Sequence, residues 1–180
     1  MTCIVGLVDD GRVYIGADSA SGQENSWTVR ATKLPKVFRI GEFIIGYTDS
    51  FRMGQLLQYH LDVRPQNEES DMEYMVKVFA EAARETLKKY GFARVENNEE
   101  TGGTFLVGYR KHLYTIDADF QVNEMADDMD ACGCGAEYAL GALRAVRKKT
   151  PVERILLALD VAAHFSGGVK PPFRVESDAT

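Results

Sequence analysis

The sequence predicts an α+β fold, a four-layer α/β/β/α sandwich built from two antiparallel sheets. Turn residues between β-rich runs indicate hairpins at three places, and helical patterns come in pairs after the second and third hairpins. Because hairpins rather than single strands alternate with the helix pairs, the sheets should be antiparallel with helices on their outer faces. A chain of 180 residues suits a single domain that spans residues 1–180.

Two hairpins account for the N-terminal part of the chain. Asp-Gly separates the β-rich runs of the first hairpin, and Gly-Glu separates those of the second. The four expected strands cover residues 3–8, 12–17, 36–40 and 43–47. Between the hairpins we expect a loop with a short strand around residues 27–31.

Four helices are expected in the remainder. The first starts at Ser50, and the second follows a capping-box sequence at Ser70–Glu73 that precedes apolar residues at helical spacing. A third helix, rich in small residues, begins at Ala136. The fourth begins at Thr150–Glu153, where Thr provides the cap, Pro fits the first turn and Glu completes the capping box.

The other segments are expected to be extended or irregular. Residues 96–103 are polar and predict a loop before the third hairpin, whose strands cover 104–109 and 113–117. The acidic, turn-rich segment 118–130 leaves room for one more strand. The tail at 171–176 predicts an edge strand.

Composition limits the classes of function. The 27 Asp and Glu outnumber the 21 Lys and Arg, which gives a net charge of −6, and without a basic block this argues against nucleic acid as the main partner. No apolar run approaches the roughly 18 residues that span a bilayer, and the start lacks signal-peptide features. We therefore expect a cytoplasmic protein that neither spans nor binds a membrane.

The sequence gives no sign of a cofactor. Its three cysteines are too few for a disulfide framework and are read as thiols. No Cys or His pair has the spacing of a zinc site, so we expect no metal and no other cofactor.

Thr2 is the most informative candidate nucleophile. Initiator methionine is commonly removed before a small residue, and its removal would leave Thr2 with a hydroxyl and a free α-amine. An α-amine titrates near 7.7 and can accept the hydroxyl proton directly or through water. Met-Thr by itself is common without chemical meaning; the strand that starts immediately after Thr2 makes it informative.

An acid and a lysine are expected beside Thr2. Asp18 follows the second strand, where antiparallel pairing returns the chain to the N-terminus. The same position is also consistent with an ordinary aspartate in a turn. A carboxylate there can hold a buried lysine ammonium, which would lower the pKa of the nucleophile. Lys36 at the start of the third strand is the preferred lysine, and Lys33 is its rival.

The segment Cys132-Gly133-Cys134-Gly135 has three interpretations. A metal pair lacks a second pair of ligands, and a redox pair lacks a basic neighbour. The favoured interpretation is that the glycines allow close backbone approach at a helix N-terminus, which would bring a Cys134 sulfur or an amide near the site. Ser166-Gly167-Gly168 is read either as part of this site or as a helix C-cap.

Taken together, these residues resemble the N-terminal nucleophile (Ntn) hydrolases, in particular proteasome β-type subunits and the bacterial proteasome-like peptidase that works with a ring ATPase. The resemblance covers nearly the whole chain. It rests on the order of Thr2, Gly16-Ala17-Asp18, the strand that begins at Lys36, the segment Ala131–Leu140 and Ser166-Gly167.

The resemblance implies a threonine protease mechanism. Thr2 would attack the scissile carbonyl with its own amine as base, while Lys36, oriented by Asp18, tunes that amine. Cys134 and Ser166 would complete the catalytic set. Substrate would bind as an added β-strand along Ser19–Ser21 and Thr48–Ser50, and backbone N–H groups near Thr48, Asp49 and Ser50 would stabilise the oxyanion.

The resemblance also implies partners: copies of this chain in homo-oligomeric rings, a ring ATPase unfoldase and a polypeptide substrate. Two positions depart from the family pattern, because Cys134 replaces a glycine-flanked serine and Ala163 replaces an aspartate. Two other functions stay open. One is a small-molecule amidohydrolase of the same fold, and the other is a catalytically silent subunit in which Met1 is retained.

Overall fold

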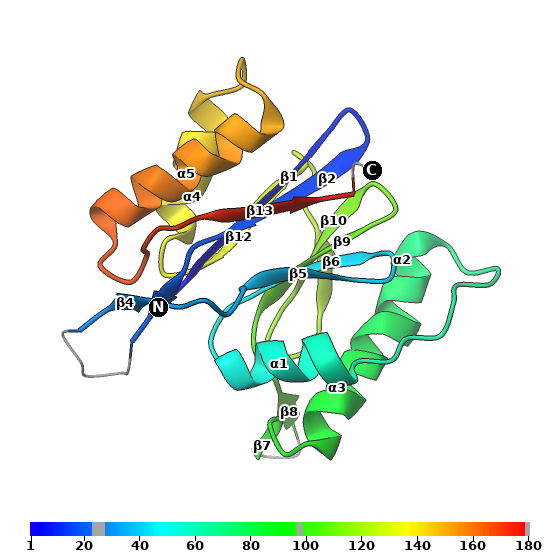
Figure 1. Ribbon diagram of the computed structural model, residues 1–180. Helices are drawn as coiled ribbons and strands as arrows, with labels where there is room; N and C mark the ends of the chain where they lie inside the picture. Colours follow the sequence, from blue (N-terminus) through cyan, green and yellow to red (C-terminus); the bar gives the residue numbers. More distant parts are fainter. Residues whose placement is uncertain (23–27, 97–98, 179–180) are drawn as a thin grey trace.

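The computed structural model describes residues 1–22, 28–96 and 99–178, and in them it has the predicted four layers (Figure 1). The first sheet has four antiparallel strands, in the order β12 (Met129–Gly133), β1 (Cys3–Asp9), β2 (Arg12–Ala17) and β13 (Arg174–Ser177). The second has five, in the order β11 (Val122–Glu124), β10 (His112–Ile116), β9 (Phe105–Tyr109), β6 (Phe43–Tyr47) and β5 (Val37–Ile40).

Helices cover the outer face of each sheet. The four-stranded sheet is covered by α4 (Ala136–Ala145) and α5 (Pro151–Phe165), and the five-stranded sheet by α1 (Phe51–His60) and a longer helical segment (Figure 1). That segment consists of α2 (Asp71–Tyr74), the π-helical turn η1 (Met75–Phe79) and α3 (Ala80–Lys89). The helix caps expected from the sequence form, since Ser50, Ser70 and Thr150 each accept a backbone N–H of the first turn.

Three apolar clusters hold the layers together. The cluster between the two sheets includes Ile4, Ile15, Ile44 and Leu106, all fully buried. A larger, aromatic-rich cluster lies between the five-stranded sheet and its helices, and a third packs α4 and α5 on the four-stranded sheet. Because β6 is covered on both faces, all five of its residues are buried, and its sequence is apolar throughout instead of alternating between apolar and polar residues.

The expected strands are confirmed, with four differences in detail. The segment around 96–103, expected to be a loop, contains the short strands β7 (Arg94–Glu96) and β8 (Glu99–Thr101). Both β11 and the start of β12 fall within 118–130, where one strand was expected. His112, expected in a turn, begins β10. Of the short strand expected around 27–31, the structure has β4 (Arg30–Ala31) paired with β3 (Ala20–Ser21), and Trp27 lies outside the described residues.

The strand pairing brings the N-terminus to one end of the sandwich. Strand β1 is central in its sheet, where β12 and β2 flank it on opposite sides. Its first residue pairs with Gly133, and Ile4 pairs with Ala17. Thr2 therefore lies beside the end of β2 and the end of β12, with the start of β5 in the facing sheet. Along the described ranges, no helix is both long and apolar enough to cross a membrane.

Candidate active site

Thr2 is buried at the head of strand β1, with 6% of its surface exposed. Its Oγ1 accepts a hydrogen bond from Lys36 Nζ at 3.1 Å and donates one to the carbonyl oxygen of Met1. Lys36 Nζ also donates to the Met1 carbonyl oxygen, at 3.2 Å. The hydroxyl of Thr2 is thus fixed by a lysine ammonium on one side and by the preceding peptide on the other.

Asp18 holds the ammonium of Lys36 in place. Its Oδ1 lies 2.9 Å from Lys36 Nζ, and both side chains are withdrawn from solvent, with 2% exposure for the lysine and 0% for the aspartate. Lys36 comes directly before β5, where its carbonyl oxygen accepts from Tyr47 N–H and so continues the ladder with β6. The rival lysine, Lys33, is exposed. The structure therefore brings Lys36, and not Lys33, to Thr2.

Backbone amides from three segments converge on the Asp18 carboxylate. Cys3 N–H donates to Oδ1 at 3.0 Å, while Ala20 N–H and Lys170 N–H donate to Oδ2 at 2.7 and 3.1 Å. With Lys36, the carboxylate accepts four hydrogen bonds, which is the full capacity of an ionised carboxylate. Asp18, directly after β2, therefore links β1, β3 and the segment before β13 around Thr2.

Burial of Lys36 has an electrostatic consequence. Desolvation lowers the pKa of the Lys36 ammonium from its ordinary value of 10.5, while the adjacent Asp18 carboxylate opposes that shift. The centroid of the Phe51 ring lies 5.9 Å from Nζ, which is within the range of a cation–π contact. Such an ammonium next to a hydroxyl stabilises negative charge that develops on the oxygen.

Cys134 contacts the backbone of Thr2 and the side chain of Ser166. Its Sγ accepts from the backbone N–H of Thr2 at 3.4 Å, donates to the carbonyl oxygen of Thr2 at 3.4 Å and accepts from Ser166 Oγ at 3.5 Å. Cys134 and Ser166 therefore both join the site, although Ser166 is also the C-cap of α5. Gly133 and Cys132 end a strand instead of opening the helix directly.

Two glycines make this close approach possible. A Cβ on Gly133, whose φ is +94°, would lie 2.3 Å from the carbonyl oxygen of Thr2. A Cβ on Gly168 would lie 2.6 Å from Cys134 Sγ. Neither position can carry a side chain without a shift of the N-terminal peptide or of the thiol.

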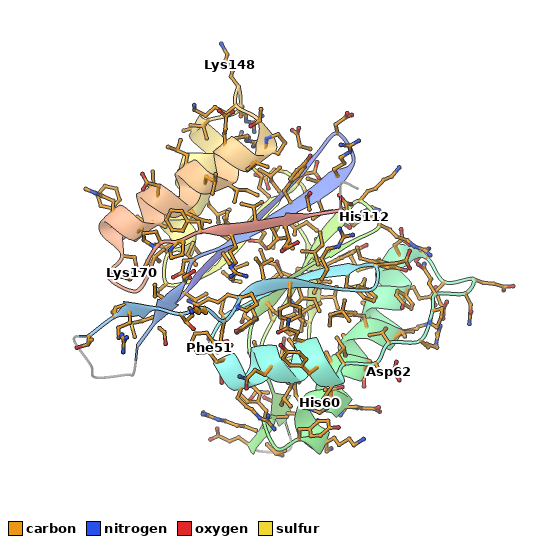
Figure 2. All side chains as sticks on the ribbon, in the orientation of Figure 1. Phe51, His60, Asp62, His112, Lys148 and Lys170 are labelled. Atoms are coloured by element: carbon orange, nitrogen blue, oxygen red, sulfur yellow. The ribbon has the colours of Figure 1, made fainter. Side chains whose placement is uncertain are left out.

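A cleft opens over Thr2 between β3 and the segment that connects β6 to α1. Its lining includes Ser21, Gly22, Tyr47, Asp49 and Phe51. Met1 lies in it, with its terminal methyl group within 2.3 Å of where a Cβ on Gly22 would stand. Figure 2 labels Phe51 and Lys170, which lie at the same end of the sandwich as the N-terminus.

The three amides expected near the oxyanion differ in availability. Thr48 N–H donates to the carbonyl oxygen of Thr104 at 3.1 Å, and Ser50 N–H donates to that of Thr48 at 2.7 Å. Asp49, at φ +61°, has a backbone N–H with no acceptor among the described residues. Its carboxylate accepts from Thr104 N–H at 2.9 Å, which holds the turn in this conformation. Asp49 N–H is therefore the amide that remains free to bind a ligand oxygen.

The two serines expected along the substrate differ in the same way. Ser19 is buried, and all three of its polar groups form hydrogen bonds. Its hydroxyl donates to the carbonyl oxygen of Pro172, and its N–H donates to that of Lys170. Its own carbonyl oxygen accepts from Thr32 N–H. Ser19 therefore belongs to the scaffold, whereas Ser21 lines the cleft.

Sequence reasoning missed three contributors to this site. They are the Met1 carbonyl oxygen, the Lys170 N–H and the Phe51 ring. Lys170 and Phe51 reach the site only through tertiary packing, and no local motif marks them.

Comparisons with solved structures give the fold. BPH from Thiobacillus denitrificans, in complex with epoxomicin, superposes with a TM-score of 0.79 at 19% identity, over 97% of this chain and 97% of that chain. Eukaryotic HslV from Trypanosoma brucei has a TM-score of 0.70 at 20% identity, over 97% and 98%. Anbu, an ancestral beta-subunit from Yersinia bercovieri, has a TM-score of 0.69 at 12% identity, over 97% and 80%.

No family model and no curated protein matches the sequence. The likeness to solved structures nevertheless extends over almost the entire chain, and the chain has the fold that BPH, HslV and Anbu share.

Proposed function

We propose that this chain is a threonine-type peptidase subunit that hydrolyses peptide bonds with Thr2 as nucleophile after Met1 has been removed. One observation carries the proposal: Lys36 Nζ bridges Thr2 Oγ1 at 3.1 Å and Asp18 Oδ1 at 2.9 Å in a buried setting. A buried lysine that is paired with one carboxylate and aimed at one hydroxyl is an arrangement that activates a nucleophile.

The chemistry follows from the two functional groups of a free Thr2. The α-amine takes the proton of Oγ1 as the oxygen attacks the substrate carbonyl, and the Lys36 ammonium stabilises the charge that develops on Oγ1. The protonated amine then gives the proton to the leaving amine, and an ester on Thr2 remains. Water, deprotonated by the same amine, hydrolyses that ester and regenerates the hydroxyl.

The surroundings supply the other requirements of this reaction. Asp49 N–H is the donor we assign to the oxyanion, and such a donor is commonly worth about 3 to 4 kcal/mol. The cleft edge at β3, with Ser21, would receive an extended peptide as an added strand. Cys134 would hold the α-amine of Thr2 through its sulfur, at the position where it accepts the Thr2 N–H in the structure.

Met1 opposes the reaction while it is attached. It converts the Thr2 nitrogen into an amide that cannot act as a base, and its carbonyl oxygen occupies both Lys36 Nζ and Thr2 Oγ1. Removal of Met1 is therefore part of the proposal. A silent subunit is the function that would remain if Met1 were retained.

We also propose how the peptidase is assembled. We expect copies of this chain to form homo-oligomeric rings in the cytoplasm, because a peptidase with an unselective nucleophile must be kept apart from folded proteins. A ring ATPase unfoldase would deliver polypeptide substrate to these rings. One structural neighbour is described as a beta-subunit, which supports a multi-subunit state.

Substrate profiling on protein that begins at Thr2 tests the activity. A fusion that is cleaved directly before Thr2 supplies this protein, and Thr2→Ala supplies the control. Hydrolysis of fluorogenic peptides that is lost in Thr2→Ala supports the proposal. Turnover of small amides without turnover of peptides would replace it with an amidohydrolase, and equal turnover by both proteins would refute the role of Thr2.

A further inference from the structure

A second cleft, of about 270 Å³, lies at the other end of strand β1 from Thr2. Its charged lining consists of Asp9, Asp127, Asp128, Arg147 and Arg154. Strand β1 has seven residues, so the two clefts are about 20 Å apart. Lys148, labelled in Figure 2, marks the connection between α4 and α5 that forms one side of this cleft.

Arg154 enters this cleft with most of its hydrogen-bonding capacity unused. Its side chain is nine-tenths buried, since only 9% of it is exposed. Nη1 lies 3.6 Å from Asp9 Oδ1, Nη2 donates to the sulfur of Met129 at 3.4 Å, and Nε has no hydrogen-bond partner within the described residues. A guanidinium has five N–H donors, and a buried one is stable only when they are paired with oxygen acceptors.

Charges of both signs line the cleft. Arg154 and the exposed Arg147 provide two positive charges, and three aspartates provide three negative charges. A simple anion would pair with the guanidinium groups but would face the aspartates, and a simple cation would leave Arg154 Nε without an acceptor. A molecule that carries both a carboxylate and an ammonium satisfies both sides of the cleft.

We propose that this cleft binds a small zwitterion of the α-amino acid class, with its carboxylate at Arg154 and Arg147 and its ammonium at the aspartates. The planar guanidinium is the side chain whose geometry suits a carboxylate. The volume lies just below the usual range of small-molecule sites, which suits a ligand as small as an amino acid. Because the lining has one more negative than positive charge, a basic amino acid should bind more tightly than an acidic one.

Calorimetric titration of the full chain with L-lysine, L-glutamate, acetate and methylammonium tests the proposal. We expect saturable binding of L-lysine, with weaker binding of L-glutamate and no measurable binding of the two single-charge probes. Arg147→Gln should weaken L-lysine binding about fivefold, and Asp127→Asn combined with Asp128→Asn should weaken it by a similar factor. These three residues are exposed, so the variants should remain folded.

Matched variants outside the cleft complete the experiment. Lys148→Gln and Asp160→Asn change the same charges at exposed positions that do not line the cleft, and both should bind L-lysine like the unaltered chain. The proposal is overturned if L-lysine does not saturate, if acetate binds as tightly as L-lysine, or if the control variants lose as much affinity as the cleft variants. Because binding is measured directly, a failure here leaves the peptidase proposal untouched.

Discussion

Replacement of Asp18 by asparagine should strongly destabilise the protein. Oδ1 accepts from Lys36 Nζ and Cys3 N–H, and Oδ2 accepts from Ala20 N–H and Lys170 N–H. In Asp18→Asn the amide NH₂ faces two donors in either orientation, and the buried ammonium loses its counter-charge. Breaking a buried ion pair from one side costs about 3 to 5 kcal/mol.

The reverse substitution should cost less. In Lys36→Met the Asp18 carboxylate keeps three backbone N–H donors, so its charge remains solvated by the protein, and the loss should be about 1 to 2 kcal/mol. At about 2 to 4 °C per kcal/mol for a chain of this size, Asp18→Asn should melt roughly 6 to 20 °C below the natural protein and Lys36→Met only a few degrees below it.

Calorimetry or thermal circular dichroism measures the difference. Asp178→Asn is a suitable control, because Asp178 Oδ1 also accepts one backbone N–H, from Val13 at 2.9 Å, but forms no ion pair with any described residue. The control should lose less than about 1 kcal/mol. If Asp18→Asn melts within two degrees of the control, or above Lys36→Met, the account of Asp18 as the counter-charge of a buried ammonium is wrong.

Three further predictions concern the same site. Burial lowers the pKa of Lys36 below 10.5, so the unfolded chain holds this proton more tightly than the folded chain does. The free energy of unfolding of the natural protein, relative to that of Lys36→Met, should therefore rise as the pH increases from the folded-state pKa toward 10.5. Urea unfolding at several pH values measures this difference, and a difference that falls with pH would contradict the prediction. In protein that begins at Thr2, Lys36→Ala should lower the rate of peptide hydrolysis by at least about a hundredfold, because a hydrogen-bond donor worth about 3 kcal/mol is lost from the site. Lys33 is exposed, so Lys33→Ala should keep the normal rate. Equal losses in the two variants would remove Lys36 from the mechanism. Cys134→Ser should keep or raise the rate, because oxygen accepts a hydrogen bond better than sulfur, whereas Cys134→Val should lower it; kcat/KM for one peptide distinguishes these outcomes.

The hairpins and helices could be predicted because their signals are local. Asp-Gly at the first turn and the capping box at Thr150 act over a few residues, and the structure has both. The π-helical turn has no such signal in the sequence. Strands β7 and β8 form a separate, largely exposed hairpin in a polar segment whose composition favours a loop.

The site could be predicted only in part. The return of Asp18 to Thr2 follows from hairpin pairing, but the choice between Lys36 and Lys33 depends on the register of a strand in the other sheet. That Thr48 N–H donates to Thr104, and Ser50 N–H to Thr48, depends on the folded conformation of the turn at Asp49. The burial of Arg154 is likewise visible only in the folded chain, because its position on α5 gives no sign that it lies beside Asp9.

The central claim is that Thr2 becomes an N-terminal nucleophile. Its most direct test is the intact mass of natively expressed protein before and after treatment with a peptide epoxyketone, which reacts with a hydroxyl and an amine on neighbouring carbons. We predict a mass that lacks Met1 and a single adduct that maps to Thr2 and is absent from Thr2→Ala. A chain that keeps Met1 and gains no adduct, or an adduct that persists in Thr2→Ala, would contradict the claim.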